Sequence, residues 1–131
     1  APNYAGVNYI LQVFDTMSMD EVYKDIQNIY RTAYYKVGRF AEFNTLGKVL
    51  SAAGKKNEAL LVFQFNTYYH SGSWYGYKSY GELLVEMENF PEAIKAYDKL
   101  LALNPENEEA KAELERLNKL VPEEEEKAEG N

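Results

Sequence analysis

The feature that most constrains the fold is an internal repeat of 34 residues. Residues 40–73 align with residues 74–107 without a gap, and seven aligned pairs preserve the size or the chemical class of the side chain. In the first copy the seven positions are Phe43, Leu46, Gly47, Leu50, Ala59, Leu60 and Phe63. In the second copy they are Tyr77, Tyr80, Gly81, Leu84, Ala93, Ile94 and Tyr97. Such a period favours an array of short units that bury their apolar faces on one another.

Within each copy the apolar residues recur every three or four positions, which is the spacing of a helix face. Gly54 is a stop signal between two such helices, because glycine adopts the left-handed conformation at little cost. Asn89 and Pro91 suit the start of the second helix in the second copy, and Asn104-Pro105 ends that helix. We therefore expect an all-α fold, an antiparallel array of two helical hairpins with flanking helices.

The flanking helices are predicted by their own signals. Ser18-Met19-Asp20-Glu21 is a capping box and predicts a helix that ends near Tyr35. A second flanking helix is expected over residues 107–121, where acidic residues in the first turn suit the helix dipole. Two repeats alone are marginal, so the flanking helices are needed to complete a core. The expected helical domain covers residues 18–121.

The two ends of the chain do not follow this scheme. Residues 1–17 contain an apolar run from Tyr9 to Phe14, for which the sequence offers no partner strand. We expect residues 1–17 to form an extended arm that packs on the first helices. Residues 122–131 contain four consecutive glutamates, which repel one another, and we expect a disordered acidic tail there.

Residues 74–107 resemble a tetratricopeptide repeat, a helix–turn–helix unit of 34 residues. The resemblance rests on residues at positions 4, 7, 8, 20, 24 and 32 of the family pattern, which are here Tyr77, Tyr80, Gly81, Ala93, Tyr97 and Pro105. Residues 40–73 resemble a second copy, with Ser71 in place of the final proline. The resemblance implies that the helix over 107–121 is the solvating helix that ends such arrays.

A looser resemblance is to C-terminal segments of secreted bacterial serine hydrolases of the esterase and β-lactamase-like group. It rests on three stretches, Met17 to Glu21, Gly54 to Phe63, and Ala93 to Asn107. It implies that the chain is an accessory domain, with a hydrolase domain upstream of Ala1 and a periplasmic or extracellular location. Without that link, a cytoplasmic location is expected.

The composition removes most catalytic chemistry from consideration. The chain has 131 residues, no cysteine, one histidine and a formal charge of −7. His70 lies in a predicted turn beside Ser71 and Ser73, and sequence neighbours seldom form a triad. We expect no catalytic activity, no cofactor and no metal site. The acidic balance argues against nucleic acid as a partner, and no apolar run is long enough for a membrane helix.

What remains is binding to a protein or peptide. In the tetratricopeptide family the inner helix of each repeat lines a concave face, at positions 2, 5, 9 and 12. The resemblance places there Ala41, Asn44, Lys48 and Ser51 from the first copy, and Tyr75, Lys78, Glu82 and Val85 from the second. This mixed, polar face suits an extended peptide or a helix. Asn44 and Lys48 stand in reversed order relative to the clamp that some members use for C-terminal carboxylates, which disfavours a chaperone tail.

The aromatic loop between the copies is a second candidate surface. Tyr68, Trp74 and Tyr75 do not occupy core positions of the repeat. Exposed flat rings stack on sugars or anchor a protein interface. Alternatively, they pack on the N-terminal region, which has tyrosines of its own. Three functions therefore stay open: a non-catalytic protein-interaction or scaffolding module, a hydrolase accessory domain, and a glycan-binding module.

Overall fold

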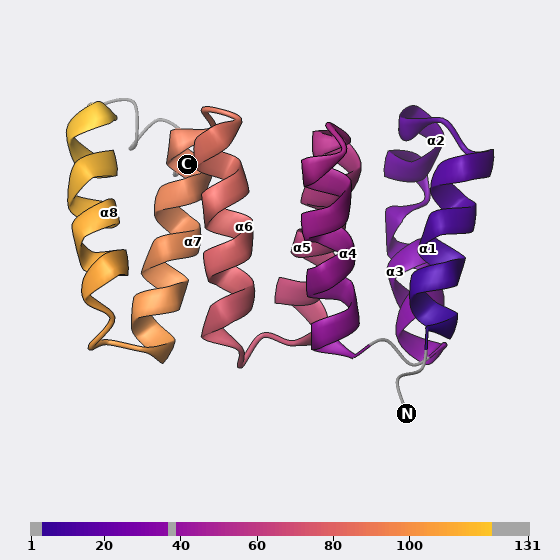
Figure 1. Ribbon diagram of the computed structural model, residues 1–131, viewed down its shortest axis with the longest axis horizontal. Helices are drawn as coiled ribbons and strands as arrows, with labels where there is room; N and C mark the ends of the chain where they lie inside the picture. Colours follow the sequence, from indigo (N-terminus) through magenta and orange to yellow (C-terminus); the bar gives the residue numbers. More distant parts are fainter. Residues whose placement is uncertain (1–3, 37–38, 122–131) are drawn as a thin grey trace. The chain divides into compact units, whose positions relative to one another are not determined.

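The computed structural model describes residues 4–36 and 39–121. These residues form eight α-helices and no strand, which confirms the all-α prediction (Figure 1). The helices are α1 (Ala5–Thr16), α2 (Met19–Lys24), α3 (Ile26–Tyr35), α4 (Phe40–Ala52), α5 (Lys56–Tyr69), α6 (Trp74–Glu86), α7 (Phe90–Leu103) and α8 (Glu108–Leu120).

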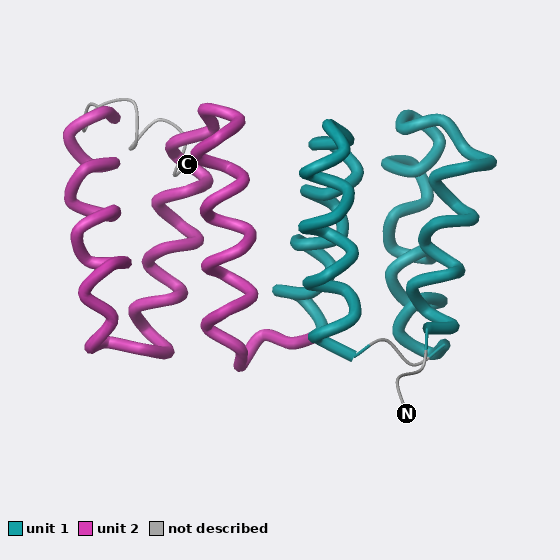
Figure 2. The backbone as a smooth tube through the Cα atoms, in the orientation of Figure 1, with its two compact units in different colours: residues 1–69 teal, residues 70–131 magenta. Residues whose placement is uncertain are grey.

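The chain divides into two compact units, residues 1–69 and residues 70–131 (Figure 2). The first unit contains α1 to α5 and the second contains α6 to α8. Each predicted copy of the repeat supplies one helical hairpin, α4 with α5 in the first unit and α6 with α7 in the second. The predicted acidic tail at 122–131 lies outside the described residues.

The core of the first unit is built around α5. Most of this helix is buried, as its nearly continuous apolar sequence predicts. Phe43 of α4 and Phe65 of α5 are almost fully buried, with ring centroids 4.4 Å apart. Tyr30 of α3 donates a hydrogen bond to Oε1 of Gln64 at 3.0 Å, which joins α3 to α5. The helices before the repeat therefore complete its core.

Two expectations for the N-terminal region are wrong. The described part of the expected extended arm is helical instead, because Ala5–Thr16 is an α-helix that packs on α3. Its buried residues Gly6, Ile10 and Val13 are four and three positions apart, so one helix face carries the apolar side chains that a strand would alternate. The expected single helix up to Tyr35 is interrupted at Asp25, which leaves helical geometry with φ −113° and ψ 20°. Aspartate favours such non-helical positions.

The 34-residue repeat is also a repeat of packing. A Cβ atom on Gly47 would lie 2.6 Å from Cδ1 of Phe63, and one on Gly81 would lie 3.0 Å from Cε2 of Tyr97. In both hairpins the glycine of the first helix thus faces the aromatic ring of the second. The absence of a side chain on these glycines therefore allows the two helices of each hairpin to approach closely.

The turns inside the two hairpins are also equivalent. Gly54 has φ +84°, and Glu88, 34 positions later, has φ +61°. After α4 the amide of Lys55 donates to the carbonyl of Leu50 at 2.9 Å, and after α6 the amide of Asn89 donates to the carbonyl of Leu84 at 2.8 Å. This is the Schellman arrangement, which requires a left-handed residue before the donor.

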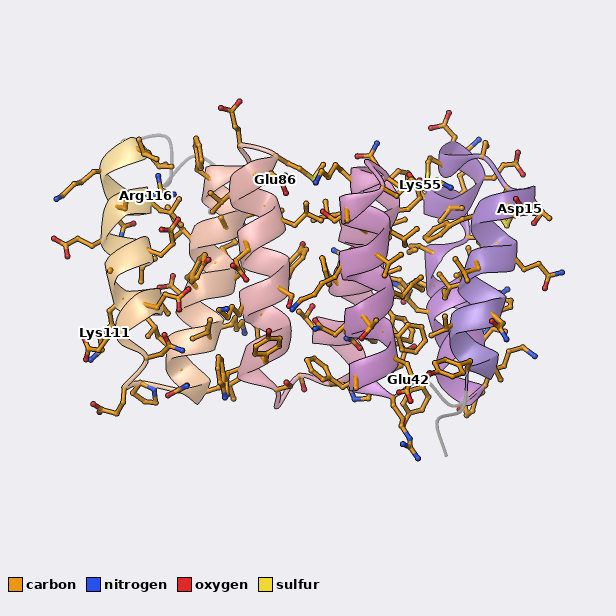
Figure 3. All side chains as sticks on the ribbon, in the orientation of Figure 1. Asp15, Glu42, Lys55, Glu86, Lys111 and Arg116 are labelled. Carbon is orange, nitrogen blue, oxygen red and sulfur yellow. The ribbon has the colours of Figure 1, made fainter. Side chains whose placement is uncertain are left out.

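The helix α8 closes the second unit as an amphipathic helix. Ala110 and Leu117 are buried, while its outer surface carries ion pairs between residues three apart. Lys111 pairs with Glu108 at 3.2 Å, and Arg116 pairs with Glu113 (Figure 3 labels both cations). Pairs of this kind support an exposed helix face.

Candidate interaction surfaces

The predicted binding residues of the second copy share one face of α6. Tyr75, Lys78, Glu82 and Val85 are three, four and three positions apart, which is the spacing of a helix stripe. Glu82 is exposed and the other three are half-buried. The face therefore combines an aromatic ring and an aliphatic side chain with a charged centre.

That charged centre is held in place within the face. Nζ of Lys78 lies 5.4 Å from the ring centroid of Tyr75 and 3.7 Å from Oε1 of Glu82. Trp74 meets Tyr75 edge to face, with centroids 5.6 Å apart. A cation over an aromatic ring and beside a carboxylate loses less freedom when a ligand binds, because its side chain is already oriented.

The predicted residues of the first copy are less uniform. Lys48 is exposed on α4, and Ser51 is half-buried and accepts a hydrogen bond from Nζ of Lys56 at 2.9 Å. Asn44 is buried, with 8% of its surface accessible. A buried side chain offers little surface to a peptide. Asn44 therefore does not lie on an accessible binding face, contrary to the expectation.

The residues predicted to form an aromatic loop lie instead in helices, Tyr68 near the end of α5 and Trp74 and Tyr75 at the start of α6, and they differ in exposure. Tyr68 is 63% exposed, whereas Trp74 and Tyr75 are half-buried. The ring of Tyr68 lies 4.8 Å from that of Tyr69 and 6.4 Å from that of Tyr30. Tyr68 thus packs on a tyrosine of the N-terminal region, as one alternative predicted, and still presents most of its surface.

An open hollow of about 580 Å³ in the first unit was not predicted. Tyrosines from the ends of α3 and α5 form its aromatic part, and the segment around the α2–α3 break forms its polar part. The lining residues are Lys24, Asp25, Ile26, Gln27, Asn28, Arg31, Tyr34, Tyr35, Tyr68 and Tyr69. The one sequence signal for it is the pair of tyrosine doublets, Tyr34-Tyr35 and Tyr68-Tyr69, which lie 34 positions apart, the first doublet falling before the first aligned copy of the repeat.

Several tyrosine pKa values are shifted upward. Burial, followed by the neighbouring Tyr68, raises the pKa of Tyr69, and the Arg31 cation opposes this shift. Burial is also the main cause that raises the pKa of Tyr80 and of Tyr97 in the second unit. A tyrosine hydroxyl with its ordinary pKa of 10.0 is already protonated at neutral pH, and the raised pKa keeps these three hydroxyls protonated to higher pH.

The described ranges contain neither a cluster of metal-binding side chains nor a helix that could span a membrane. Within residues 4–36 and 39–121, no group of three or more acidic or histidine side chains is placed to hold a metal ion. In the same part of the chain, no helix is both long and apolar enough to cross a membrane.

Comparison with known proteins gave one positive result. The family model described as tetratricopeptide repeat matches residues 74–107, the same limits as the second copy of the repeat. A search of curated proteins found no significant match. The matched segment contains α6 and α7, and with them the stripe from Tyr75 to Val85.

Proposed function

This chain carries a tetratricopeptide repeat at residues 74–107, and we propose that it binds an extended peptide or a helix of a partner protein on the face of α6. Tetratricopeptide repeats generally serve in protein–protein interaction or scaffolding, and this chain is such a module. The family is typically non-catalytic, and an all-helical fold fits that role. The position and chemistry of the binding face are the proposal.

The observation that carries the proposal is the arrangement around Lys78. The Tyr75 ring and the Glu82 carboxylate hold the ammonium group between them, and all three lie on one helix face. A peptide on this face would meet aromatic and aliphatic surface at Tyr75 and Val85. Its carbonyl and amide groups would pair with Lys78 and Glu82. Lys48 and Ser51 occupy the positions of α4 that correspond to Glu82 and Val85, and they are proposed to form a polar binding face of the first unit.

The test begins with a peptide library displayed against the whole chain, followed by titration of the selected peptides. Trp74, the single tryptophan of the chain, adjoins Tyr75, so its fluorescence reports binding near the face. We expect Val85→Glu to weaken binding about tenfold or more, because a charge replaces the aliphatic contact at one end of the face.

The matched control is Val49→Glu, which makes the same change at an α4 valine that is 60% exposed and lies off the stripe. Lys78→Glu and Lys95→Glu form a second pair, on α6 and on α7. Equal affinities for the Val85 and Val49 variants would contradict the proposal, as would a library that yields no binder.

A glycan-binding function is a second proposal, favoured by the edge-to-face pair of Trp74 and Tyr75. A sugar ring stacked on either side chain would change the tryptophan emission. Titration with oligosaccharides of several classes separates the two functions, since a flat response across all of them removes the glycan.

The hydrolase accessory role is a proposal about a longer gene product. Its test is the sequence encoded upstream of Ala1. A hydrolase domain there would support it, and a start codon or a signal sequence immediately before Ala1 would refute it.

A further inference from the structure

We infer that the tyrosine hollow of the first unit is a binding site for a proline-rich segment of a partner protein in the polyproline II conformation. The residues that line the hollow lie within 24–35 and 68–69, and none of them belongs to the face proposed to bind on α6. The inference is therefore independent of the function proposed for the second unit.

The first argument is the geometry of the rings. Tyr34 and Tyr69 stack with centroids 4.6 Å apart and an angle of 19° between their planes. Tyr35 meets Tyr34 at 71°, and Tyr68 meets Tyr69 at 80°. Two rings thus stand edge to face against a central stack. Aromatic walls of this kind accept the compact pyrrolidine rings of proline, whose fixed conformation leaves little conformational entropy to lose.

The exposure of the tyrosine rings at the hollow is not explained by packing of the core. Tyr35 is 76% exposed and Tyr68 is 63% exposed, and Tyr34 is 47% exposed. Exposed aromatic groups that lie together mark a binding surface more often than scattered ones do. Single exposed tyrosines elsewhere, such as Tyr23 at 49%, have no such neighbours among the ring pairs of the described residues.

The third argument is that the rings have a rigid support. Tyr30 is buried, its hydroxyl is fixed by Gln64 at 3.0 Å, and its ring meets Phe65 edge to face at 5.3 Å. The rings of Tyr68 and Tyr69 both lie 6.4 Å from the ring of Tyr30. The walls of the hollow are therefore oriented before a ligand arrives, which lowers the entropic cost of binding.

The polar side of the hollow is ordered by hydrogen bonds among its own side chains. Nδ2 of Asn28 donates to Oδ2 of Asp25 at 3.4 Å, and Nη2 of Arg31 donates to Oδ1 of Asn28 at 3.1 Å. These bonds orient planar polar groups beside the rings and leave each group further hydrogen-bonding capacity. A polyproline II peptide needs only a few donors for its solvated carbonyls, and the tyrosine hydroxyls supply such donors.

The test is fluorescence anisotropy of a dye-labelled decaproline peptide with the whole chain. A Gly-Ser peptide of equal length with the same dye controls for binding of the dye. We expect saturable binding of decaproline, weakened about fivefold or more by Tyr35→Ser and by Tyr68→Ser, because each change removes one aromatic wall. Tyr23→Ser is the matched control and should leave the affinity within about twofold, since it removes an exposed tyrosine outside the hollow.

Circular dichroism establishes that each variant is folded. Should a serine variant unfold, NMR shift mapping of the wild-type chain with decaproline replaces it, and shifts confined to residues 24–36 and 64–69 support the site. No saturable decaproline binding overturns the inference, and so does equal weakening by Tyr23→Ser. Titration with cellohexaose and chitohexaose is the last arm. Sugar binding that Tyr35→Ser and Tyr68→Ser abolish, without decaproline binding, would identify a glycan site instead.

Discussion

The two left-handed turn residues allow a stability prediction of opposite sign in the two repeats. Gly54 and Glu88 hold equivalent positions, with φ of +84° and +61°. An L-residue in this conformation costs about 1–2 kcal/mol. Glycine adopts it freely but loses about 0.5–1 kcal/mol more backbone entropy on folding. Glu88→Gly should therefore stabilise the chain by about 0.5–1 kcal/mol, and Gly54→Ala should destabilise it by a similar amount.

The structure gives no packing contribution that would obscure this difference. Glu88 is exposed, and a Cβ on Gly54 would meet nothing within 4 Å. The assay is urea unfolding followed by Trp74 fluorescence, which reports on the second unit, and by circular dichroism, which reports on all helices. For a chain of this size the gain from Glu88→Gly corresponds to a rise in Tm of about 3 °C.

The control for Glu88→Gly is Glu86→Gly, two positions earlier in the last turn of α6. There the backbone is helical, so the same substitution should lower stability by about 0.5–1 kcal/mol. If both glycine substitutions lower the Trp74-detected midpoint, or if both leave it unchanged, the left-handed conformation of Glu88 does not carry the energy assigned to it.

Three further predictions concern packing, capping and pH. Gly47→Ala should destabilise the chain by about 1–3 kcal/mol, because the new methyl group overlaps the ring of Phe63. Gly81→Ala should cost clearly less, because its Cβ would lie 3.0 Å from the ring of Tyr97 and alanine favours the helix. The urea midpoints of the two variants compare these costs. Asn107→Ala should cost about 1 kcal/mol, since Oδ1 caps the amide of Ala110 at 2.9 Å, while Asn118→Ala on the exposed face of α8 serves as a near-neutral control in thermal melts. Burial raises the pKa of Tyr97 above its usual 10.0, so the folded chain keeps a proton that the unfolded chain loses. Stability should therefore fall as pH rises above about 10, and less steeply in Tyr97→Phe; parallel urea midpoints for the two proteins between about pH 9 and pH 11.5 would contradict this.

The helical part of the fold follows from local signals in the sequence. Ser18 was predicted as an N-cap, and its Oγ accepts from the amide of Glu21 at 3.3 Å. The stop at Gly54 was predicted from glycine alone, and the chain turns there in the left-handed conformation. Such signals act over four or five residues, so a single sequence carries them completely.

The failures arise where the local signal is ambiguous. The apolar run from Tyr9 to Phe14 is short, and a run of this length does not distinguish a strand from a buried helix. The outcome depended on Gly6, Ile10 and Val13 sharing a face against α3, which is a tertiary contact. The left-handed conformation of Glu88 was missed as well. The repeat alignment identifies the position, but glutamate, unlike glycine, gives no local signal for that conformation.

The geometry of the candidate faces was predicted to different degrees. The α6 stripe could be predicted because family positions map directly onto Tyr75, Lys78, Glu82 and Val85. The burial of Asn44 could not, since the pattern assigns a face and not the depth of each side chain. The tyrosine hollow was not predicted either, because it joins the end of α3 to the end of α5 and α3 precedes the two aligned copies, although Tyr34-Tyr35 stand 34 positions before Tyr68-Tyr69.

The second repeat provides an internal comparison for the tyrosine hollow. The residues 34 positions after Tyr68 and Tyr69 are Ala102 and Leu103, at the end of α7. Ala102 is exposed and Leu103 is 43% exposed. The equivalent helix of the second hairpin therefore ends in an alanine and a leucine. Packing of the repeat does not require two tyrosines at these positions. The rings at Tyr68 and Tyr69 are an addition specific to the first unit, where α3 supplies Tyr34 and Tyr35 to meet them. An addition that packing of the repeat does not require, and that leaves the rings of Tyr35 and Tyr68 largely in solvent, is what a ligand stacked on those rings would explain.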